Sequence, residues 1–493
     1  MSKDTNRWLG RTAYQIMPDR FYRVGEPLTS LPDGKVVKSW SDRKVDWEPA
    51  DDGEYYNQYY WGGNLKGIIA KLDYLKSLGV GLIYHTPIGL AASNHRYDPI
   101  DQSEIDPILG TWEEYRELCN EAHKRDILVV PDLVFNHTSN KSVYLQDSEL
   151  RSEYYKENEN GDLPYWSVFK DMIECNKHNR RYQDDMTEIV RKYLVHGADG
   201  IRLDLAEILS TDFLQALTRV RDEFPEVLFI GECWGFADEM LTVLDSSMNY
   251  PIDDAILRWV RWGMDLHFLY NFQRVYSSYP EESLPVLLNI ADSHDTIRLI
   301  TMLVADYMNG DVFSGQIWDI EAPWRSPNSF DTYGFRKRES ELDVIEGEMY
   351  DLGKKLAKMV LAILYTIPGI PCIFQGTELG ETGFKDPFNR KPMNWDNYDT
   401  DMLQFVSTMG QYRIESSDIL AEGKFEIVRV DADVLIIERY QEECGHIYLA
   451  INRTSSPKEI TIPDNEEAFK QIYSNGKNSI TKLDSYGIYI VRQ

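Results

Sequence analysis

The chain has 493 residues, of which 43% are hydrophobic and 27% are charged, and its formal net charge is −29. This composition is that of a globular protein. The acidity argues against binding to nucleic acid, which needs Lys and Arg to neutralise phosphates, and against an anionic membrane surface. We therefore expect a neutral substrate.

The amino terminus, MSKDTNRWLGRTAY, lacks the basic-then-apolar pattern of an export signal, and no stretch approaches the ~20 apolar residues that span a bilayer. The five cysteines are odd in number, scattered, and without Cys-x-x-Cys spacing. This pattern predicts reduced thiols rather than a disulfide framework or a zinc site, and a cytoplasmic protein.

Short β-branched runs alternate with amphipathic helical patterns between Ala13 and about Tyr412, which is typical of βαβ units and a parallel sheet. The expected strands cover 13–18, 80–85, 127–135, 200–205, 227–232, 247–251, 286–292 and 370–375. The expected helices include 64–78, 111–126, 184–196 and 211–223. Eight parallel strands close a barrel, so the pattern predicts an α/β fold of the (β/α)₈ type. A doubly wound open sheet is the alternative, but no Gly-x-Gly-x-x-Gly follows a strand.

Two long segments interrupt this rhythm, and a third region replaces it. Residues 138–180 are polar and too long for a simple loop, so we expect a small inserted domain there. Residues 309–349 form a second insertion on the expected active-site face, with the aromatic side chains Trp318, Trp324 and Phe330. Strand pairs follow residue 418. The expected domains are a barrel at 1–137 and 181–417, the insert at 138–180, and an antiparallel β-sandwich at 418–493.

Charged and imidazole side chains end four of the expected strands. They are Asp132, Asn136 and His137 on the third strand, Arg202 and Asp204 on the fourth, Glu232 on the fifth, and His294 and Asp295 on the seventh. Reactive groups of barrel enzymes lie at these strand ends. Any one of these residues alone is more often structural, but the joint pattern indicates a single cleft.

Hydrolysis of a glycosidic bond with retention needs a carboxylate nucleophile and a second carboxyl group that donates a proton. Arg202 stands two residues before Asp204, so both side chains face the same side of a strand, and the guanidinium is expected to keep Asp204 ionised. Glu232 has the apolar neighbours Cys233 and Trp234, which suit a proton-carrying acid.

These segments resemble the signature regions of the α-amylase family (glycoside hydrolase family 13). The matching segments are Asp132 to His137, Gly200 to Asp204, Gly231 to Trp234, His294-Asp295, the loop Ser93 to Asp98, the segment Gly369 to Glu378, and the loop Asp386 to Arg390. The resemblance covers residues 11–416. It is strongest to the neopullulanase, cyclomaltodextrinase and maltogenic amylase group.

The resemblance implies a role for each matching residue. Asp204 is implied as nucleophile, Glu232 as acid/base and Asp295 as transition-state stabiliser. The implied substrate-binding residues are Tyr97, His137, Arg202, His294, Asp386 and Arg390. The implied activity is double-displacement hydrolysis of α-1,4-glucosidic bonds in maltooligosaccharides, cyclodextrins or related α-glucans.

Calcium is common in the family, where the Asn that matches Asn136 is a ligand. The sequence offers no local loop of oxygen ligands, so we expect neither a metal nor another cofactor. The oligomeric state stays open.

Two other functions stay open. A transglycosylase or phosphorylase on the same scaffold uses the same covalent intermediate, because only the acceptor differs. An inactive barrel that merely binds carbohydrate is the third class.

Overall fold

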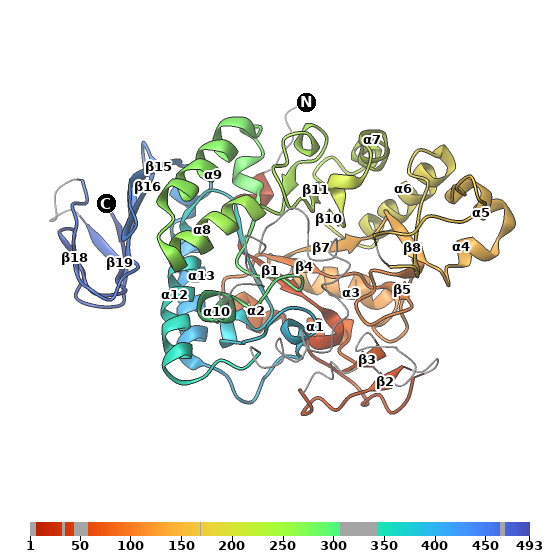
Figure 1. Cartoon of the computed structure of the whole chain (residues 1–493), viewed down its shortest axis with the longest axis horizontal. Coiled ribbons are helices and arrows are strands. Elements are labelled where there is room, and N and C mark those ends of the chain that lie inside the picture. The colour runs from red at the N-terminus through yellow and green to blue at the C-terminus, as the bar shows by residue number, and fades with distance from the viewer. Residues whose placement is uncertain (1–5, 32–34, 44–57, 168, 306–342, 464–468) are drawn as a thin grey trace.

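Eight parallel strands form the barrel (Figure 1) in the computed structural model, which describes residues 6–31, 35–43, 58–167, 169–305, 343–463 and 469–493. The strands are β1 (Ala13–Ile16), β4 (Leu82–His85), β7 (Leu128–Leu133), β10 (Gly200–Leu203), β11 (Leu228–Gly231), β12 (Ser246–Ser247), β13 (Leu288–Ile290) and β14 (Ile370–Phe374). They are hydrogen-bonded in the order β12-β11-β10-β7-β4-β1-β14-β13. A parallel bridge between Met248 and Leu288 joins the two outer strands. The predicted fold class is confirmed.

Helices cover the outside of the barrel. They are α1 (Leu65–Ala70), α2 (Leu72–Ser77), α3 (Trp112–His123), α6 (Arg180–Val195), α7 (Thr211–Leu217), α8 (Tyr250–Trp262), α9 (Asp265–Ser278), α10 (Leu299–Val304), α12 (Gly347–Thr366) and α13 (Thr400–Glu415). The single helix expected over 64–78 is divided into α1 and α2, because Lys71 leaves helical geometry with φ −107° and ψ 5°. A capping box between Thr111 and Glu114 starts α3.

The interior of the barrel has an apolar layer built from alternate positions of its strands. Its members include Ala13, Leu82, Leu128, Val130, Leu228, Ile230, Leu288, Ile290, Ile370 and Cys372, together with Trp8. Gly200 is the small residue that makes room for Trp8, since a Cβ at this position would lie 2.9 Å from the indole ring. Side chains two residues further along the same strands continue the inward face, so this layer supports whatever lies at the carboxyl ends.

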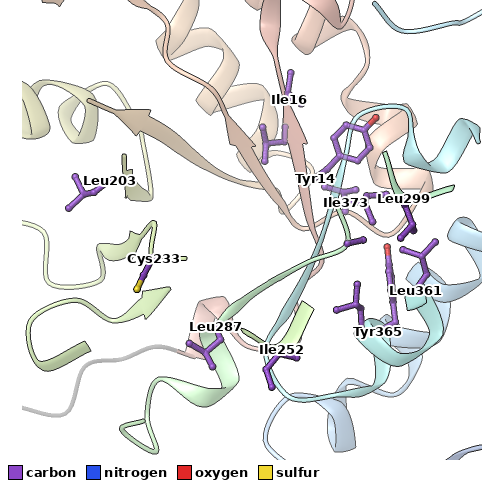
Figure 2. Packing of buried hydrophobic residues seen from close by; sticks show 14 of the residues in the cluster. Tyr14, Ile16, Leu203, Cys233, Ile252, Leu287, Leu299, Leu361, Tyr365 and Ile373 are labelled. Carbon is purple, nitrogen blue, oxygen red and sulfur yellow. The ribbon is translucent and has the colours of Figure 1, made fainter. Parts of the chain in front are cut away.

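The other strand positions pack against the helices in the main hydrophobic core. Figure 2 shows part of this layer, where Tyr14 of β1 and Ile373 of β14 lie near Leu299 of α10 and near Leu361 and Tyr365 of α12. All five side chains are at most 1% exposed.

The segment between β7 and α6 leaves the barrel and carries its own small elements. They are β8 (His137–Ser139), α4 (Val143–Gln146), α5 (Ser148–Tyr154) and β9 (Met172–Glu174), and β8 pairs antiparallel with β9. Shorter pairs lie elsewhere on this face, between β2 (Val36–Val37) and β3 (Tyr59–Tyr60) and between β5 (Gly89–Ala91) and β6 (Pro99–Ile105).

A five-stranded antiparallel sheet follows the short helix α14 (Ser417–Leu420) and lies at one end of the molecule (Figure 1). Its order is β15 (Lys424–Val430), β16 (Val434–Gln441), β17 (Gly445–Asn452), β21 (Ile488–Arg492) and β19 (Lys470–Ser474). One face, with Leu435 and Ile437, joins the barrel core. The opposite face, with Val434 and Ile436, packs in a separate cluster that includes Leu483. That residue belongs to the pair β18 (Lys458–Glu459) and β20 (Lys482–Leu483). The prediction of antiparallel β-structure at the C-terminal end is confirmed.

Among the described residues, no helix is long and apolar enough to cross a membrane. Most of the 309–349 insertion, including Trp318, Trp324 and Phe330, lies outside the described residues.

Candidate active site

A buried guanidinium, that of Arg202 on β10, joins three carboxylates at the carboxyl end of the barrel. Its Nη1 donates to Asp132 at 2.8 and 2.7 Å and to Asp204 at 3.1 Å. Its Nη2 lies 3.0 Å from Glu232 Oε2. Arg202 itself is 0% exposed. One positively charged side chain therefore contacts three carboxylates, which come from three neighbouring strands.

Asp204 follows β10 and continues the inward face that begins with Gly200 and Arg202. Burial raises the pKa of Asp204 well above its ordinary value, and nearby Glu232 raises it further, while Arg202 lowers it. The sequence interpretation that Arg202 keeps this carboxyl ionised is incomplete, because Arg202 is shared with two other acids. The cluster favours keeping one proton between neighbouring carboxyl groups.

Glu232 follows β11 and accepts hydrogen bonds on both carboxylate oxygens. Oε2 accepts from the backbone N–H of Leu205 at 2.8 Å, and Oε1 accepts from the indole N–H of Trp234 at 3.0 Å. Leu205 has a left-handed backbone with φ 48°, which is unusual for a branched residue and stores strain beside the site. The surroundings of Glu232 thus differ from the apolar neighbourhood expected from Cys233 and Trp234.

Asp295 lies beyond β13, where cationic and imidazole groups meet it. Arg390 Nη2 donates to its Oδ1 at 3.1 Å, and His294 Nε2 lies 3.0 Å from its Oδ2. Burial alone raises the pKa of Asp295, but His294, Arg390 and Arg202 together lower it well below the usual range. Asp295 is therefore a permanent negative charge. The opposite shifts separate its role from that of Asp204.

Arg390 is fixed by its other donors as well. Its Nε donates to the backbone oxygen of His294 at 2.7 Å, and its Nη1 lies 3.2 Å from Asp386 Oδ2. The loop that carries Asp386 and Arg390 is thus connected directly to the end of the seventh barrel strand. Arg390 contacts Asp295 directly, and Asp386 is connected to Asp295 through Arg390.

Tyr97 lies in a loop whose conformation is stabilised by contacts of the neighbouring side chains. Ser93 donates twice to Asp98, and Arg96 pairs with Asp106 at 3.1 Å. Tyr97 stacks on His294 with ring centroids 5.2 Å apart and an interplanar angle of 2°, and its hydroxyl donates to Asp132 at 2.7 Å.

His137 lies on the other side of this loop, because its Nε2 is 2.7 Å from the backbone oxygen of Tyr97. Its ring stacks on Trp166 at 5.2 Å. Burial lowers the pKa of His137 to about 4, so the ring is neutral near pH 7.

Four residues that contact the site, Asp132, Tyr84, Gln15 and Trp234, had no catalytic or binding role predicted from the sequence. Asp132 was recognised only as part of a motif, yet it accepts from Arg202, Tyr97 and also Tyr84, whose hydroxyl is 3.0 Å away. Gln15 donates its amide to His294 Nδ1 at 2.7 Å, so His294 carries its proton on Nε2 and donates to Asp295. Trp234 contacts Glu232. The sequence offered one indication for Gln15 and Asp132. Each lies two residues after an apolar residue that faces the barrel interior, so its side chain faces the same way.

Among the described residues, no group of three His, Cys, Asp or Glu side chains is arranged to hold a metal ion. The arrangement instead brings together four acids, two arginines and two imidazoles, which suits a neutral ligand on which positive charge develops.

Comparison with known proteins finds relatives of one kind. Residues 15–168 match the family described as "Alpha amylase, catalytic domain". An amylopullulanase from Thermoanaerobacterium saccharolyticum is 29% identical over 97% of this chain and 41% of its own length. An intracellular maltogenic amylase from Bacillus subtilis (strain 168) is 29% identical over 85% of this chain and 64% of its own. The chain is thus similar to members of the α-amylase family of glycoside hydrolases along most of its length.

The barrel and the terminal sheet together also match solved structures of this architecture. The ligand-free cyclic α-maltosyl-(1→6)-maltose hydrolase from Arthrobacter globiformis superposes with a TM-score of 0.78 at 23% identity, covering 99% of this chain and 100% of that one. The chain spans about two fifths of the length of the amylopullulanase that it matches.

Proposed function

We propose that this protein is a retaining α-glucan hydrolase with Asp204 as nucleophile and Glu232 as acid/base. One observation carries the proposal: the two carboxylates follow adjacent strands and contact opposite nitrogens of the same guanidinium. Two acids that share one guanidinium are close neighbours, and close carboxyl groups are the arrangement of a double displacement.

The proposed reaction has two steps. Asp204 attacks the anomeric carbon while the protonated Glu232 gives its proton to the leaving glycosidic oxygen, which leaves a glycosyl–enzyme ester and a free sugar hydroxyl. Glu232, now a carboxylate, takes a proton from water, and the resulting hydroxide oxygen displaces Asp204. Asp295, held ionised by His294 and Arg390, stabilises the oxocarbenium-like charge in both steps.

The remaining residues are proposed to bind the substrate. Tyr97 offers its ring face to the sugar that is cleaved, because stacking on His294 fixes the plane of that ring. His294 and His137 are proposed to contact sugar hydroxyls, and Arg202 to orient Asp204. Asp386 and Arg390 are proposed to bind the sugar next to the cleaved one.

The proposed substrates are maltooligosaccharides, cyclodextrins or related α-glucans. The names of the relatives support this class, since they act on pullulan or form maltose by name. We propose the domain limits given by the sequence, 1–137 with 181–417, 138–180, and 418–493. A cytoplasmic location is proposed because five cysteines are free and one relative is described as intracellular.

Product analysis tests the substrate and the acceptor together. The enzyme is incubated with starch, pullulan, cyclodextrin and maltotriose, with and without phosphate, and the products are separated by chromatography. Hydrolysis products without phosphate dependence support the proposal. Sugar phosphates would identify a phosphorylase, mainly longer oligosaccharides a transglycosylase, and no product from any substrate an inactive binding barrel.

The stereochemistry tests the mechanism separately. Proton NMR during the first minutes, before mutarotation, is expected to show the α-anomer of the product from an α-linked substrate. Early β-anomer would contradict a covalent intermediate on Asp204.

A further inference from the structure

The side-chain oxygen of Asn136, which the resemblance implies as a calcium ligand, is engaged by a cation of the chain itself. Lys177 Nζ donates to Asn136 Oδ1 at 2.6 Å. An ammonium group at this distance repels a divalent cation and uses the oxygen that would bind it. The residues present therefore do not fit a calcium ion at Asn136.

Lys177 and Asn136 lie at the two ends of the segment that leaves the barrel after β7. The backbone N–H of Cys175 donates to the backbone oxygen of Asn136 at 3.0 Å, which brings the ends together. The backbone oxygen of Lys177 accepts from Gln183 of α6 at 3.0 Å. The backbone at and just before Lys177 is thus hydrogen-bonded to other parts of the chain. These hydrogen bonds fix the position from which the Lys177 side chain reaches Asn136.

The contact between Lys177 and Asn136 determines how the amide of Asn136 is oriented. An ammonium group can only donate, so Oδ1 must face Lys177 and Nδ2 must face the other way. Nδ2 lies 3.2 Å from His137 Nδ1, which must accept. The single proton of the neutral imidazole is then on Nε2, where it is donated to the backbone oxygen of Tyr97 at 2.7 Å.

We propose that Lys177 is a built-in cation that takes the place of calcium and that positions His137 and Tyr97 through Asn136. The donors run in one direction, from the ammonium group to the amide, from the amide to the imidazole, and from the imidazole to the Tyr97 carbonyl. Lys177 is thus a positioning residue. It acts through Asn136 and His137 on the residue that carries the stacking ring, Tyr97.

The first test uses the unaltered protein and needs no activity. Melting temperature is measured after treatment with EDTA and after addition of CaCl₂, and calcium binding is followed by titration calorimetry. We expect no change in melting temperature and no heat of calcium binding. A melting temperature that rises with calcium, or a bound calcium ion that EDTA removes, would overturn the replacement of the metal by Lys177.

The second test reads the orientation of His137 directly. Nitrogen-15 NMR of histidine-labelled protein is expected to show His137 as the neutral Nε2–H form. In Lys177→Met the amide of Asn136 is free to turn, so both tautomers should be present. In Asn136→Asp the ammonium keeps a partner but His137 loses its donor, so the tautomer should change while the melting temperature stays close to that of the unaltered protein.

The catalytic effect rests on the proposed function, whereas the calcium and NMR tests do not. Lys177→Met is expected to lower kcat/KM on maltotriose by about 10- to 100-fold, as loss of an orienting partner does. The control is Lys156→Met, which removes an exposed lysine from the same segment and should leave both readouts unchanged. If Lys177→Met does not fold, the spectrum of the unaltered protein still decides, because an Nδ1–H tautomer there would overturn the proposal.

Discussion

The active site and the junction with the terminal sheet both bury arginine, but they surround the charge differently. Arg202 in the site faces three carboxylates. Arg413 and Arg439 at the junction donate to backbone oxygens, such as the Tyr365 oxygen at 2.9 Å for Arg413 and the Thr366 oxygen at 2.8 Å for Arg439. Neither junction arginine forms an ion pair with a described residue.

The pKa values follow this difference. Burial lowers the pKa of Arg439 to about 10 and that of Arg413 to about 9, because neutral carbonyl dipoles compensate only part of the lost hydration. Burial also acts against the charge of Arg202, but Asp132 and Glu232 raise its pKa well above the ordinary value.

Charge balance is what separates the two regions. At the junction, Arg413 and Arg439 hydrogen-bond to backbone oxygens and repel each other, and these hydrogen bonds hold the terminal sheet against the barrel. In the site, three acids compete for one guanidinium, and burial together with the neighbouring carboxylates raises the pKa of Asp204. A cluster with more carboxyl groups than cations adds little to the stability of the fold, and it is suited to proton transfer.

The largest expected effect is that of Asp204→Asn. Loss of the nucleophile should lower kcat by about 10⁴-fold or more. The melting temperature should stay constant or rise, because one acid leaves a crowded cluster. Turnover of maltotriose and thermal unfolding are measured on the same preparation. The exposed Asp222→Asn is the control, and near-normal turnover in folded Asp204→Asn would exclude the proposed nucleophile.

Arg439→Met at the junction is expected to do the opposite. It removes donors from five backbone oxygens, so the free energy of unfolding should fall by about 3 kcal/mol. The activity of the folded fraction should stay normal. Chemical denaturation measures the loss. Arg429→Met, which removes an exposed arginine paired with Asp431, should cost no more than ~0.5 kcal/mol. Equal losses in the free energy of unfolding for the two variants would show that buried Arg439 stabilises the protein no more than exposed Arg429 does.

The parts of the fold and of the site that could be predicted from the sequence are those that strand periodicity determines. The eight strands and the positions of Asp204 and Glu232 follow from buried runs that end in acids, because inward and outward positions alternate. The division of the first helix at Lys71 was missed, since local hydrophobic spacing continues through the break.

Contacts between distant segments could not be read from the sequence. Gln15 meets His294 across 279 positions of the chain, and Lys177 meets Asn136 across 41. Neither pair has a spacing that a local pattern detects, because the first depends on how the barrel closes and the second on how the segment after β7 returns to the barrel. The sharing of Arg202 among three acids also joins distant segments, so the ionisation of Asp204 could not be predicted from the spacing of Arg202 and Asp204 alone.

A smaller effect is expected from Asp253 on α8, which belongs to neither region. It is 1% exposed, and neither carboxylate oxygen has a hydrogen-bond partner among the described residues. Burial raises the pKa of Asp253 well above its ordinary value, and Asp254 and Asp292 add to this rise. The folded protein therefore keeps a proton that the unfolded chain releases above about pH 4, so stability falls as pH rises from there towards the raised pKa.

Asp253→Asn removes this dependence and should stabilise the protein at pH 7 by about 1–2 kcal/mol. The gain should shrink towards pH 4, where the unfolded chain also holds the proton. Urea denaturation between pH 4 and 8 measures it. Asp351→Asn on the exposed side of α12 is the control, and a gain that does not depend on pH would contradict a buried proton on Asp253.

The smallest expected effect is a displacement of the acid limb of kcat/KM. Activity needs Asp204 ionised in the free enzyme, so it should fall as pH drops through the raised pKa of Asp204, at a higher pH than for an ordinary aspartate. Asp132 is one cause of that rise and also competes for Arg202. In Asp132→Asn both influences weaken, so the pKa of Asp204 should fall and the acid limb should move to lower pH. The full pH profile on a chromogenic maltoside measures the limb, and it separates this shift from a uniform loss of rate. A limb that stays in place, or that moves to higher pH, would mean that Asp132 does not compete with Asp204 for the guanidinium of Arg202.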